Sequence, residues 1–303
     1  MLSICIPIFN FDVRSLVYDL HQQALQASEE FEILLMDDCS LNLYKKQNQE
    51  CASLENVTLL ELEQNIGRSR IRNKLAEVAI YRYIVFLDCD VIVAHKKFII
   101  NYLENIDGKD KVICGGHIYK AYPPDNEKLL HWYYGNIREV KNARDRNKDP
   151  YMSFMTGNFM ISKDIFRLFK FHEKISRYGH EDTLFGLDLL KNSIPTIHIN
   201  NPVVHIGLDT NLAFIKKTKQ SIDNLIYLEP ILVKYNHASS KIRLLSTFRK
   251  VKRLGICYPL AWIFKMAENA IEQNLTSKRP NMILLDLYKL GYLCMKSIRR
   301  KDS

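Results

Sequence analysis

The sequence predicts an α/β protein in which a mostly parallel sheet is flanked by helices and followed by a helical, basic C-terminal extension. Over the first hundred residues, short apolar runs alternate with amphipathic stretches, and polar clusters follow the apolar runs. Beyond residue 240, basic residues are strongly enriched. Strands that alternate with helices of about 10–15 residues form βαβ units and a parallel sheet. We therefore expect one α/β domain over residues 1–210 and an extension over residues 211–303.

The elements expected along the chain follow from the same patterns. The first strands are Leu2–Ile8, Phe31–Met36, Val57–Leu62 and Tyr83–Leu87, and the first helices are Asp12–Ala27, started by Asp12, and about 68–79. After Lys111–Tyr119 the pattern loosens, and residues 120–150 read as a loop-rich insert with a short helix around Trp132. Regular patterns return with Tyr151–Ser162, a helix opened by Glu181 and Asp182, and Thr196–His205, and from Asp209 onward the pattern is helical.

Composition limits the class of protein. Hydrophobic residues make up 47% and charged residues 25% of the 303 positions, which excludes the disordered and fibrous classes. No run approaches the ~18–20 apolar residues that span a bilayer, and the first residues read as a strand rather than a signal peptide. The seven cysteines are scattered without metal-binding spacing, which predicts a reducing compartment. We expect a cytoplasmic location.

The positive charge is confined to the C-terminal part. From residue 241 onward there are 14 Lys or Arg against 4 Asp or Glu, whereas the first 240 residues carry 29 basic and 30 acidic groups. In Lys241–Arg253, apolar residues recur every third position (Ile242, Leu245, Phe248 and Val251), which predicts an amphipathic helix. Two interpretations stay open for residues 241–303, namely a helical cap with a solvated basic face and peripheral contact with an anionic membrane. No nucleic-acid partner is expected, because no nucleic-acid module accompanies the charge.

Four polar clusters follow predicted strands: Phe9-Asn10, Asp37-Asp38, Asn65–Gly67 and Asp88–Asp90. Ligands of open parallel sheets bind at the carboxyl ends of the strands, so these clusters are expected to face one crevice. Asp88 and Asp90 suit a hard divalent ion, Mn²⁺ or Mg²⁺, that also contacts substrate phosphates. The alternative for this pair is an ordinary turn.

Three further residues allow a catalytic and a structural interpretation. Glu181 and Asp182 open a predicted helix, where the helix dipole alone favours acidic side chains. A carboxylate there can also take a proton from an acceptor hydroxyl. His205 closes a short apolar strand, either as a hydrogen-bonded structural residue or as a partner of Asp90 at a metal.

The order of these motifs resembles the inverting glycosyltransferases of family 2, which have the GT-A fold, of the bacterial surface-polysaccharide type. The resemblance covers residues 1–210 and runs through Pro7-x-x-Asn10, Asp37-Asp38-x-Ser40, Asn65-x-Gly67 with Arg72-Asn73, Asp88-x-Asp90, Gly157-Asn158, Glu181-Asp182 and His205. It implies metal-dependent transfer of a sugar from a nucleotide sugar, by default a UDP-sugar, to a hydroxyl of a glycan or lipid-linked acceptor. It also implies a nucleotide-binding half over 1–110, an acceptor half over 111–210, and a place on the inner face of the cytoplasmic membrane.

The resemblance also implies a role for each matching residue. Asp182 matches the general base, while Glu181, Gly157 and Asn158 match the acceptor side. Asp90 and His205 match the metal site. The nucleotide sugar would contact Pro7, Phe9, Asn10, Asp37, Asp38, Asn65, Gly67, Arg72 and Asp88.

Two departures and two alternatives accompany this interpretation. Residues 120–150 show no pattern that can be assigned, so the identity of the acceptor is open. Cys39 stands where the family usually has glycine, so the shape of that loop is open. A nucleotidyltransferase usually has a glycine-rich, basic loop near its first strand. The corresponding loop here, Phe9–Asp12, contains neither glycine nor lysine, which disfavours this function. A sugar-nucleotide binding domain without transfer activity is disfavoured because a binder needs no base such as Asp182.

Overall fold

The computed structural model describes residues 1–173 and 179–299, and this part of the chain forms two compact units. The first unit consists of residues 1–120, 140–173 and 181–207, and the second of residues 121–139, 179–180 and 208–299. Residues 121–139, which the sequence assigned to the acceptor half, thus cluster with the C-terminal helices. The predicted boundaries at residues 110 and 210 stay predictions.

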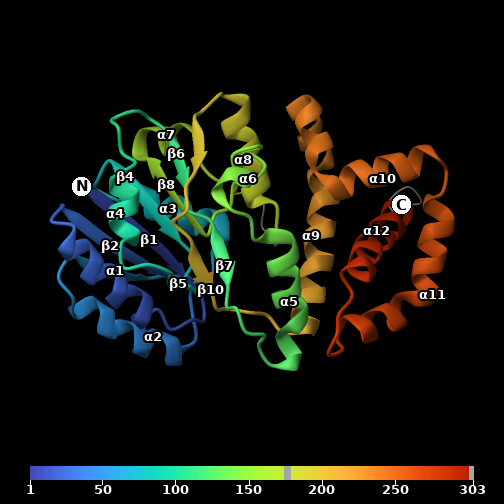
Figure 1. Cartoon of the computed structure of the whole chain (residues 1–303), viewed down its shortest axis with the longest axis horizontal. Coiled ribbons are helices and arrows are strands. Elements are labelled where there is room, and N and C mark those ends of the chain that lie inside the picture. The colour runs from blue at the N-terminus through green and yellow to red at the C-terminus, as the bar shows by residue number, and fades with distance from the viewer. Residues whose placement is uncertain (174–178, 300–303) are drawn as a thin grey trace. The chain divides into compact units, whose positions relative to one another are not determined.

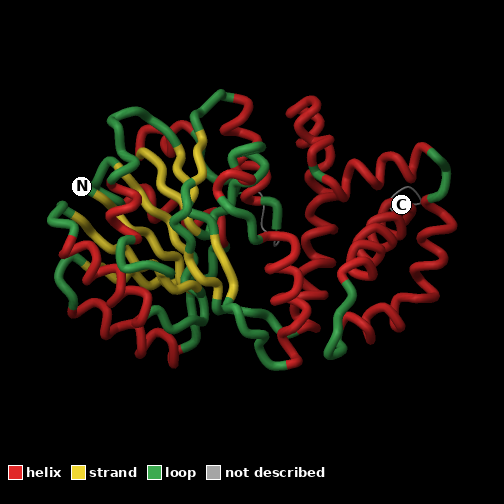
Figure 2. Tube along the Cα trace, in the orientation of Figure 1, coloured by secondary structure: helices red, strands yellow, loops and turns green. Residues whose placement is uncertain are grey.

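A seven-stranded sheet forms the centre of the first unit (Figures 1 and 2). Its order is β3-β2-β1-β4-β8-β6-β9, with β1 parallel to β2 and β4, β3 parallel to β2, and β9 parallel to β6. Only β8 is antiparallel to its neighbours β4 and β6. The strands are β1 Leu2–Ile8, β2 Phe31–Asp37, β3 Val57–Glu61, β4 Tyr83–Leu87, β6 Val112–Cys114, β8 Asn158–Ser162 and β9 Thr196–His198. The predicted mixed, mostly parallel sheet is confirmed.

A second sheet has the order β5-β10-β7, from β5 Val91–Val93, β10 Val203–His205 and β7 His117–Tyr119. The segments Lys111–Tyr119 and Thr196–His205 each contribute one strand to both sheets, which the sequence pattern did not predict. The first of them bends at Gly115-Gly116, where Gly116 has φ 83°, a conformation that glycine adopts without steric cost. This second sheet brings His205 opposite Val91, one residue from Asp90.

Two hydrophobic cores cover the two faces of the main sheet, because alternate residues of a strand point to opposite faces. Ile4 and Ile6 pack with α1 and α4, whereas Cys5 packs with α3, α7 and α8. The helices of this unit are α1 Arg14–Gln26, α2 Asn42–Asn48, α3 Arg68–Val78, α4 Phe98–Leu103, α6 Ala143–Arg146, α7 Lys163–Leu168 and α8 Glu181–Lys191, with a 3₁₀ turn, η1, at Gln49–Ser53. The helix predicted to open at Glu181 is confirmed.

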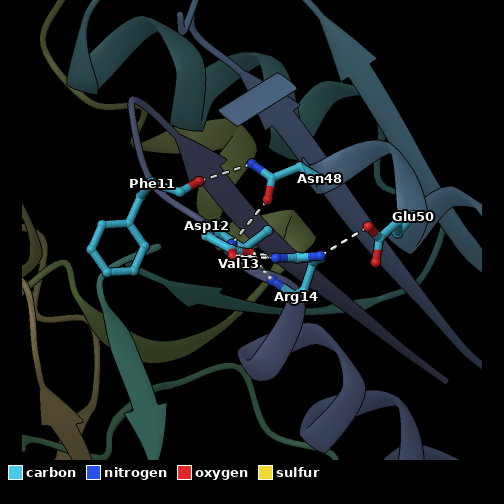
Figure 3. A network of polar contacts seen from close by, with 6 residues as sticks. All are labelled: Phe11, Asp12, Val13, Arg14, Asn48 and Glu50. Carbon is cyan, nitrogen blue, oxygen red and sulfur yellow. Dashed lines mark hydrogen bonds and ion pairs between the residues drawn. The ribbon is translucent and has the colours of Figure 1, made fainter. Parts of the chain in front are cut away.

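A polar network fixes the loop that leads from β1 into α1 (Figure 3). Asn48 donates to the carbonyl oxygen of Phe11 at 2.8 Å and accepts from the N–H of Val13 at 3.0 Å. Arg14 pairs with Asp12 and with Glu50, each at 2.8 Å. The helix therefore begins at Arg14 and not at Asp12, whose carboxylate accepts the Arg14 backbone N–H. This network holds the chain directly after Phe9 and Asn10.

The second unit is helical in its described part (Figure 2). Its helices are α5 Leu129–Tyr134, α9 Asn211–Leu232, α10 Arg243–Arg253, α11 Cys257–Leu275 and α12 Met282–Arg299, with short helical turns η2 Asn126–Lys128, η3 Gly135–Glu139 and η4 Val233–Lys241. The helix expected around Trp132 is α5, and it joins this unit through contacts with α9. Asn211 accepts the N–H of Leu130 at 2.8 Å, and the rings of His131 and Phe214 lie 4.8 Å apart.

The amphipathic helix predicted from Lys241–Arg253 is confirmed as α10. Its apolar residues Leu245, Phe248 and Val251 are at most 9% exposed, so this face belongs to the core of the second unit. Among the helices of the described residues, we find none whose length and apolar character would let it traverse a bilayer. The basic residues Arg300 and Lys301 at the predicted tail end lie outside the described residues.

Candidate active site

The ends of β1 and β2 and the loop before α3 form one hydrogen-bonded structure around Asp38. Its two carboxylate oxygens accept the backbone N–H groups of Ile66 and Gly67, at 2.7 and 3.0 Å. Asn65 donates its side-chain amide to the Asp38 carbonyl at 3.1 Å. Burial raises the pKa of the Asp38 carboxyl, while the two N–H donors act in the opposite direction. Asp38, Asn65 and Gly67, which were predicted to contact the nucleotide sugar, are thus brought together.

The neighbouring Asp37 is 1% exposed and has one uncommitted oxygen. Its Oδ1 accepts the N–H of Ser40 at 2.7 Å, whereas its Oδ2 has no hydrogen-bond partner in the structure as described. A buried acceptor without a partner is costly unless a ligand or water satisfies it. Asp37 is therefore the better candidate of the two for a hydrogen bond from the bound nucleotide.

Cys39, which stands where the family usually has glycine, adopts a left-handed backbone conformation that favours glycine. Its φ is 64°, in the left-handed region that costs a residue with a side chain roughly 1–2 kcal/mol. The Cys39 thiol lies 3.3 Å from the carbonyl oxygen of Glu63. Cys39 therefore occupies a backbone conformation that glycine would adopt without this cost.

At the end of β1, Phe9 and Asn10 differ in exposure and in role. Phe9 is 51% exposed and presents a ring that a base can stack on. Asn10 instead holds the loop, since its N–H donates to Ser40 Oγ and its Oδ1 accepts the N–H of Leu41, both at 2.8 Å. Pro7 is half-buried within β1, in register with Met36 of β2.

Asp88 follows β4 and is surrounded by positive charge. Arg72 is 2% exposed and pairs with Asp88 Oδ1, and Arg68 lies 3.7 Å from Oδ2. Burial opposes ionisation of Asp88, but the charges of both arginines outweigh it, so the pKa of this carboxyl is lowered. Arg72 was predicted to contact the nucleotide sugar. In the structure it is buried and its guanidinium forms an ion pair with Asp88.

Gly157 lies beside Asp88 because β8 is antiparallel to β4. Asp88 donates its backbone N–H to the Gly157 carbonyl at 3.1 Å, and a Cβ on Gly157 would come within 2.9 Å of Asp88 Oδ2. The absence of a side chain keeps the Asp88 carboxylate accessible.

Arg68 is a site residue that the sequence reasoning missed. Its Nε donates to Glu181 Oε1 at 2.8 Å, so the same guanidinium connects the start of α8 with Asp88 after β4. One signal was available in the sequence. Arg68 opens a helix, and the positive end of a helix dipole disfavours a cation there unless nearby negative groups compensate.

Asp182 is half-buried at the start of α8 and accepts the N–H of Thr183 at 2.6 Å. Burial, together with the neighbouring charge of Glu181, raises the pKa of its carboxyl to about 6. A carboxylate with a pKa near the working pH is suited to general base catalysis.

Asp90, the second aspartate after β4, lies beside His205. His205 Nδ1 lies 3.6 Å from Asp90 Oδ1, and the N–H groups of Ile206 and Gly207 donate to the Asp90 carbonyl. Burial raises the pKa of the Asp90 carboxyl, and the charge of Asp88 adds to this, so an added cation would stabilise the ionised form. Within residues 1–173 and 179–299, no group of three or more His, Cys, Asp or Glu is arranged to hold a metal ion. One carboxylate and one imidazole fit an ion whose remaining ligands come from phosphates and water.

Asn158, predicted on the acceptor side, is buried and hydrogen-bonded within the protein. It is 3% exposed, and its side-chain N–H groups donate to the carbonyls of Gly116 and Asn201 at 2.7 and 2.8 Å. Its Oδ1 accepts the Tyr102 hydroxyl at 2.6 Å. Both amide protons are used inside the protein, so Asn158 holds the junction of the two sheets, and its contact with an acceptor stays a prediction.

Comparisons with known proteins identify the family of this chain. The model of the family described as Glycosyl transferase family 2 matches residues 3–169, more than half of the chain. A Bacillus subtilis (strain 168) protein named as a teichuronic acid biosynthesis glycosyltransferase, TuaG, is 32% identical over 92 residues. These are 30% of this chain and 36% of TuaG, so the match spans about a third of that relative.

Two solved structures align with nearly the whole chain. The mannosyltransferase PcManGT of Pyrobaculum calidifontis, solved with GDP-Man and Mn²⁺, has a TM-score of 0.53 and 12% identity, covering 100% of this chain and 87% of that one. Residues 1–349 of S. aureus TarS give a TM-score of 0.49 at 15% identity, covering 99% and 91%. The similarity to the mannosyltransferase shows a shared fold.

Proposed function

Because the chain belongs to glycosyl transferase family 2, we propose that it transfers a sugar from a nucleotide sugar to a hydroxyl of a glycan or lipid-linked acceptor, with inversion at the anomeric carbon. The observation that carries the proposal is the bridge formed by Arg68. This residue contacts Asp88, on the expected donor side, and Glu181, beside the expected base Asp182. Donor and acceptor groups of one reaction would meet at this bridge.

The reaction is a single in-line displacement. Asp182 takes the proton of the acceptor hydroxyl, and the acceptor oxygen forms a bond to the anomeric carbon from the face opposite the nucleotide. The bond between the anomeric carbon and the diphosphate oxygen breaks, and the nucleoside diphosphate leaves with the electron pair. Glu181, held by Arg68, would orient the acceptor.

The donor side follows from the strand ends. The Phe9 ring would stack on the base and Asp37 Oδ2 would accept a hydrogen bond from the nucleotide, while Asp38, Asn65 and Gly67 shape the loop around it. Asp88 would face the ribose or sugar, positioned by Arg72. Asp90 and His205 would hold Mn²⁺ or Mg²⁺ together with the diphosphate. When bound, such an ion supplies positive charge that stabilises the leaving diphosphate.

The substrates are proposed at the level of class. A UDP-sugar is the donor expected for the family. A glycan of a surface polysaccharide, built on the cytoplasmic side, is the expected acceptor, and the name of the partial relative TuaG supports this choice.

Thermal shift with a panel of nucleotide sugars, including UDP- and GDP-sugars, tests the proposal, each with and without Mn²⁺. One donor should stabilise the chain by a few degrees, and a transfer assay with that donor should release nucleoside diphosphate. If no nucleotide sugar stabilises the protein under either condition, the proposal is refuted. Donor binding without any turnover over a broad acceptor panel would instead favour a binding domain.

A further inference from the structure

Helix α11 has apolar residues on two opposite faces. Cys257, Ala261 and Phe264 are at most 7% exposed and pack toward α12, where the rings of Phe264 and Tyr288 lie 5.2 Å apart. The opposite face carries Tyr258, Trp262 and Met266, which are 61%, 65% and 69% exposed. Residues four apart lie on the same face of a helix, so these three side chains form a continuous row.

This row continues into neighbouring positions and becomes a patch. Ile263 on α11 is 54% exposed, and Leu254, at the turn between α10 and α11, is 71% exposed. We call Leu254, Tyr258, Trp262, Ile263 and Met266 the outer apolar patch. Single exposed apolar residues need no explanation, but contiguous ones mark interaction surfaces.

The segment that carries the patch is rich in basic residues. Between residues 241 and 267 there are seven Lys or Arg and no Asp or Glu. Lys250, Lys252 and Arg253, at the end of α10, and Lys265 on α11 are exposed. The partner of this patch must therefore combine an apolar layer with negative charge.

We propose that the outer apolar patch docks on the surface of an anionic lipid bilayer. Tyrosine and tryptophan favour the level of the headgroups, apolar side chains enter the acyl boundary, and Lys and Arg bind anionic headgroups. A second copy of this chain is a poorer occupant, because two patches placed face to face would bring their basic groups together. Within residues 241–303, the apolar face of α10 is buried, whereas one apolar face of α11 is exposed, so the proposed contact lies on α11.

The inference does not depend on the proposed transfer reaction, and its test needs no substrate. The chain has two tryptophans, so Trp132→Phe leaves Trp262 as the reporter and Trp262→Phe leaves Trp132. Each variant is mixed with vesicles of phosphatidylcholine alone or with 30% phosphatidylglycerol, at low salt. Flotation reports binding, and emission and quenching by brominated acyl chains report whether tryptophan enters the bilayer.

We expect flotation with the anionic vesicles, with a blue shift and quenching for Trp262 but not for Trp132. Lys252→Glu with Arg253→Glu should weaken binding on the order of 20-fold or more, because each basic group near an anionic surface contributes about fivefold. The matched control Lys96→Glu with Lys97→Glu, two exposed lysines of the first unit, should bind like the parent. Trp262→Ser with Met266→Ser should weaken binding at least tenfold while circular dichroism stays unchanged.

Three results would overturn the proposal. The first is no flotation with anionic vesicles at low salt. The second is flotation while Trp262 emission and quenching stay unchanged, which would place the contact elsewhere. The third is a blue shift of Trp262 that depends on protein concentration without vesicles, which would identify a second copy as the occupant.

Discussion

Replacing Asp182 by asparagine removes the proposed base while keeping the size of the side chain. The loss of a positioned base costs on the order of 10²–10⁴ in rate. Since the Asp182 carboxyl has its pKa raised to about 6, the parent enzyme should also lose activity in mild acid. From pH 7 to pH 5, the ionised fraction of a group with this pKa falls from about nine-tenths to about one-tenth. The turnover number kcat should therefore fall roughly ninefold to tenfold over this range.

The assay measures release of nucleoside diphosphate at saturating donor and acceptor, for the parent and for Asp182→Asn. The matched control is Asp188→Asn, which changes another carboxylate of α8 that pairs with His172 and lies outside the proposed machinery. Near-parental turnover in Asp182→Asn would refute the assignment of the base. A kcat that stays flat between pH 7 and pH 5 would refute the reasoning from the raised pKa.

The same carboxyl gives a stability test with a fixed sign. A pKa raised on folding means that the folded state binds the proton more tightly, so this group stabilises the fold below the unfolded pKa of about 4. That contribution is lost as the pH rises through about 6. Two pKa units on a half-buried group correspond to about 2–3 kcal/mol. Relative to the parent, Asp182→Asn should gain stability between pH 4 and pH 7 in urea unfolding, and a relative loss over that range would contradict the sign.

The remaining predictions concern three other positions. Asp90→Ala should abolish the part of donor stabilisation that depends on Mn²⁺, measured by thermal shift, and an unchanged Mn²⁺ effect would remove Asp90 from the metal site. Arg68→Met should move the acid limb of kcat to higher pH, because the charge of Arg68 lowers the pKa of Asp182; an unmoved limb would speak against this coupling. Cys39→Gly should raise the free energy of unfolding by about 1 kcal/mol, because glycine adopts a φ of 64° without strain, and a lower value in urea unfolding would show that the loop is not strained.

The sequence determined the first four strands of the main sheet and the polar residues at their carboxyl ends. Runs such as Leu2–Ile8 and Tyr83–Leu87 are apolar, continuous and short, which strands buried on both faces require, so their positions followed from local pattern. The order of polar residues after these strands was enough to identify the family. These features depend on residues that are close together in the chain, so the local spacing of apolar and polar residues predicts them.

Only the tertiary structure decided which residues far apart in the chain form hydrogen bonds and ion pairs with one another. Asn158 resembles an acceptor-binding residue in the sequence, but the sheet junction uses both of its amide protons. Arg68 carries no motif, yet strand order brings Asp88 and Glu181 to either side of it. The outer face of α11 was concealed for the same reason, since a helix with apolar residues on both sides shows no periodic preference until its packing partner is known. Burial and hydrogen-bond partners are set by segments far apart in the chain, and local pattern does not contain them.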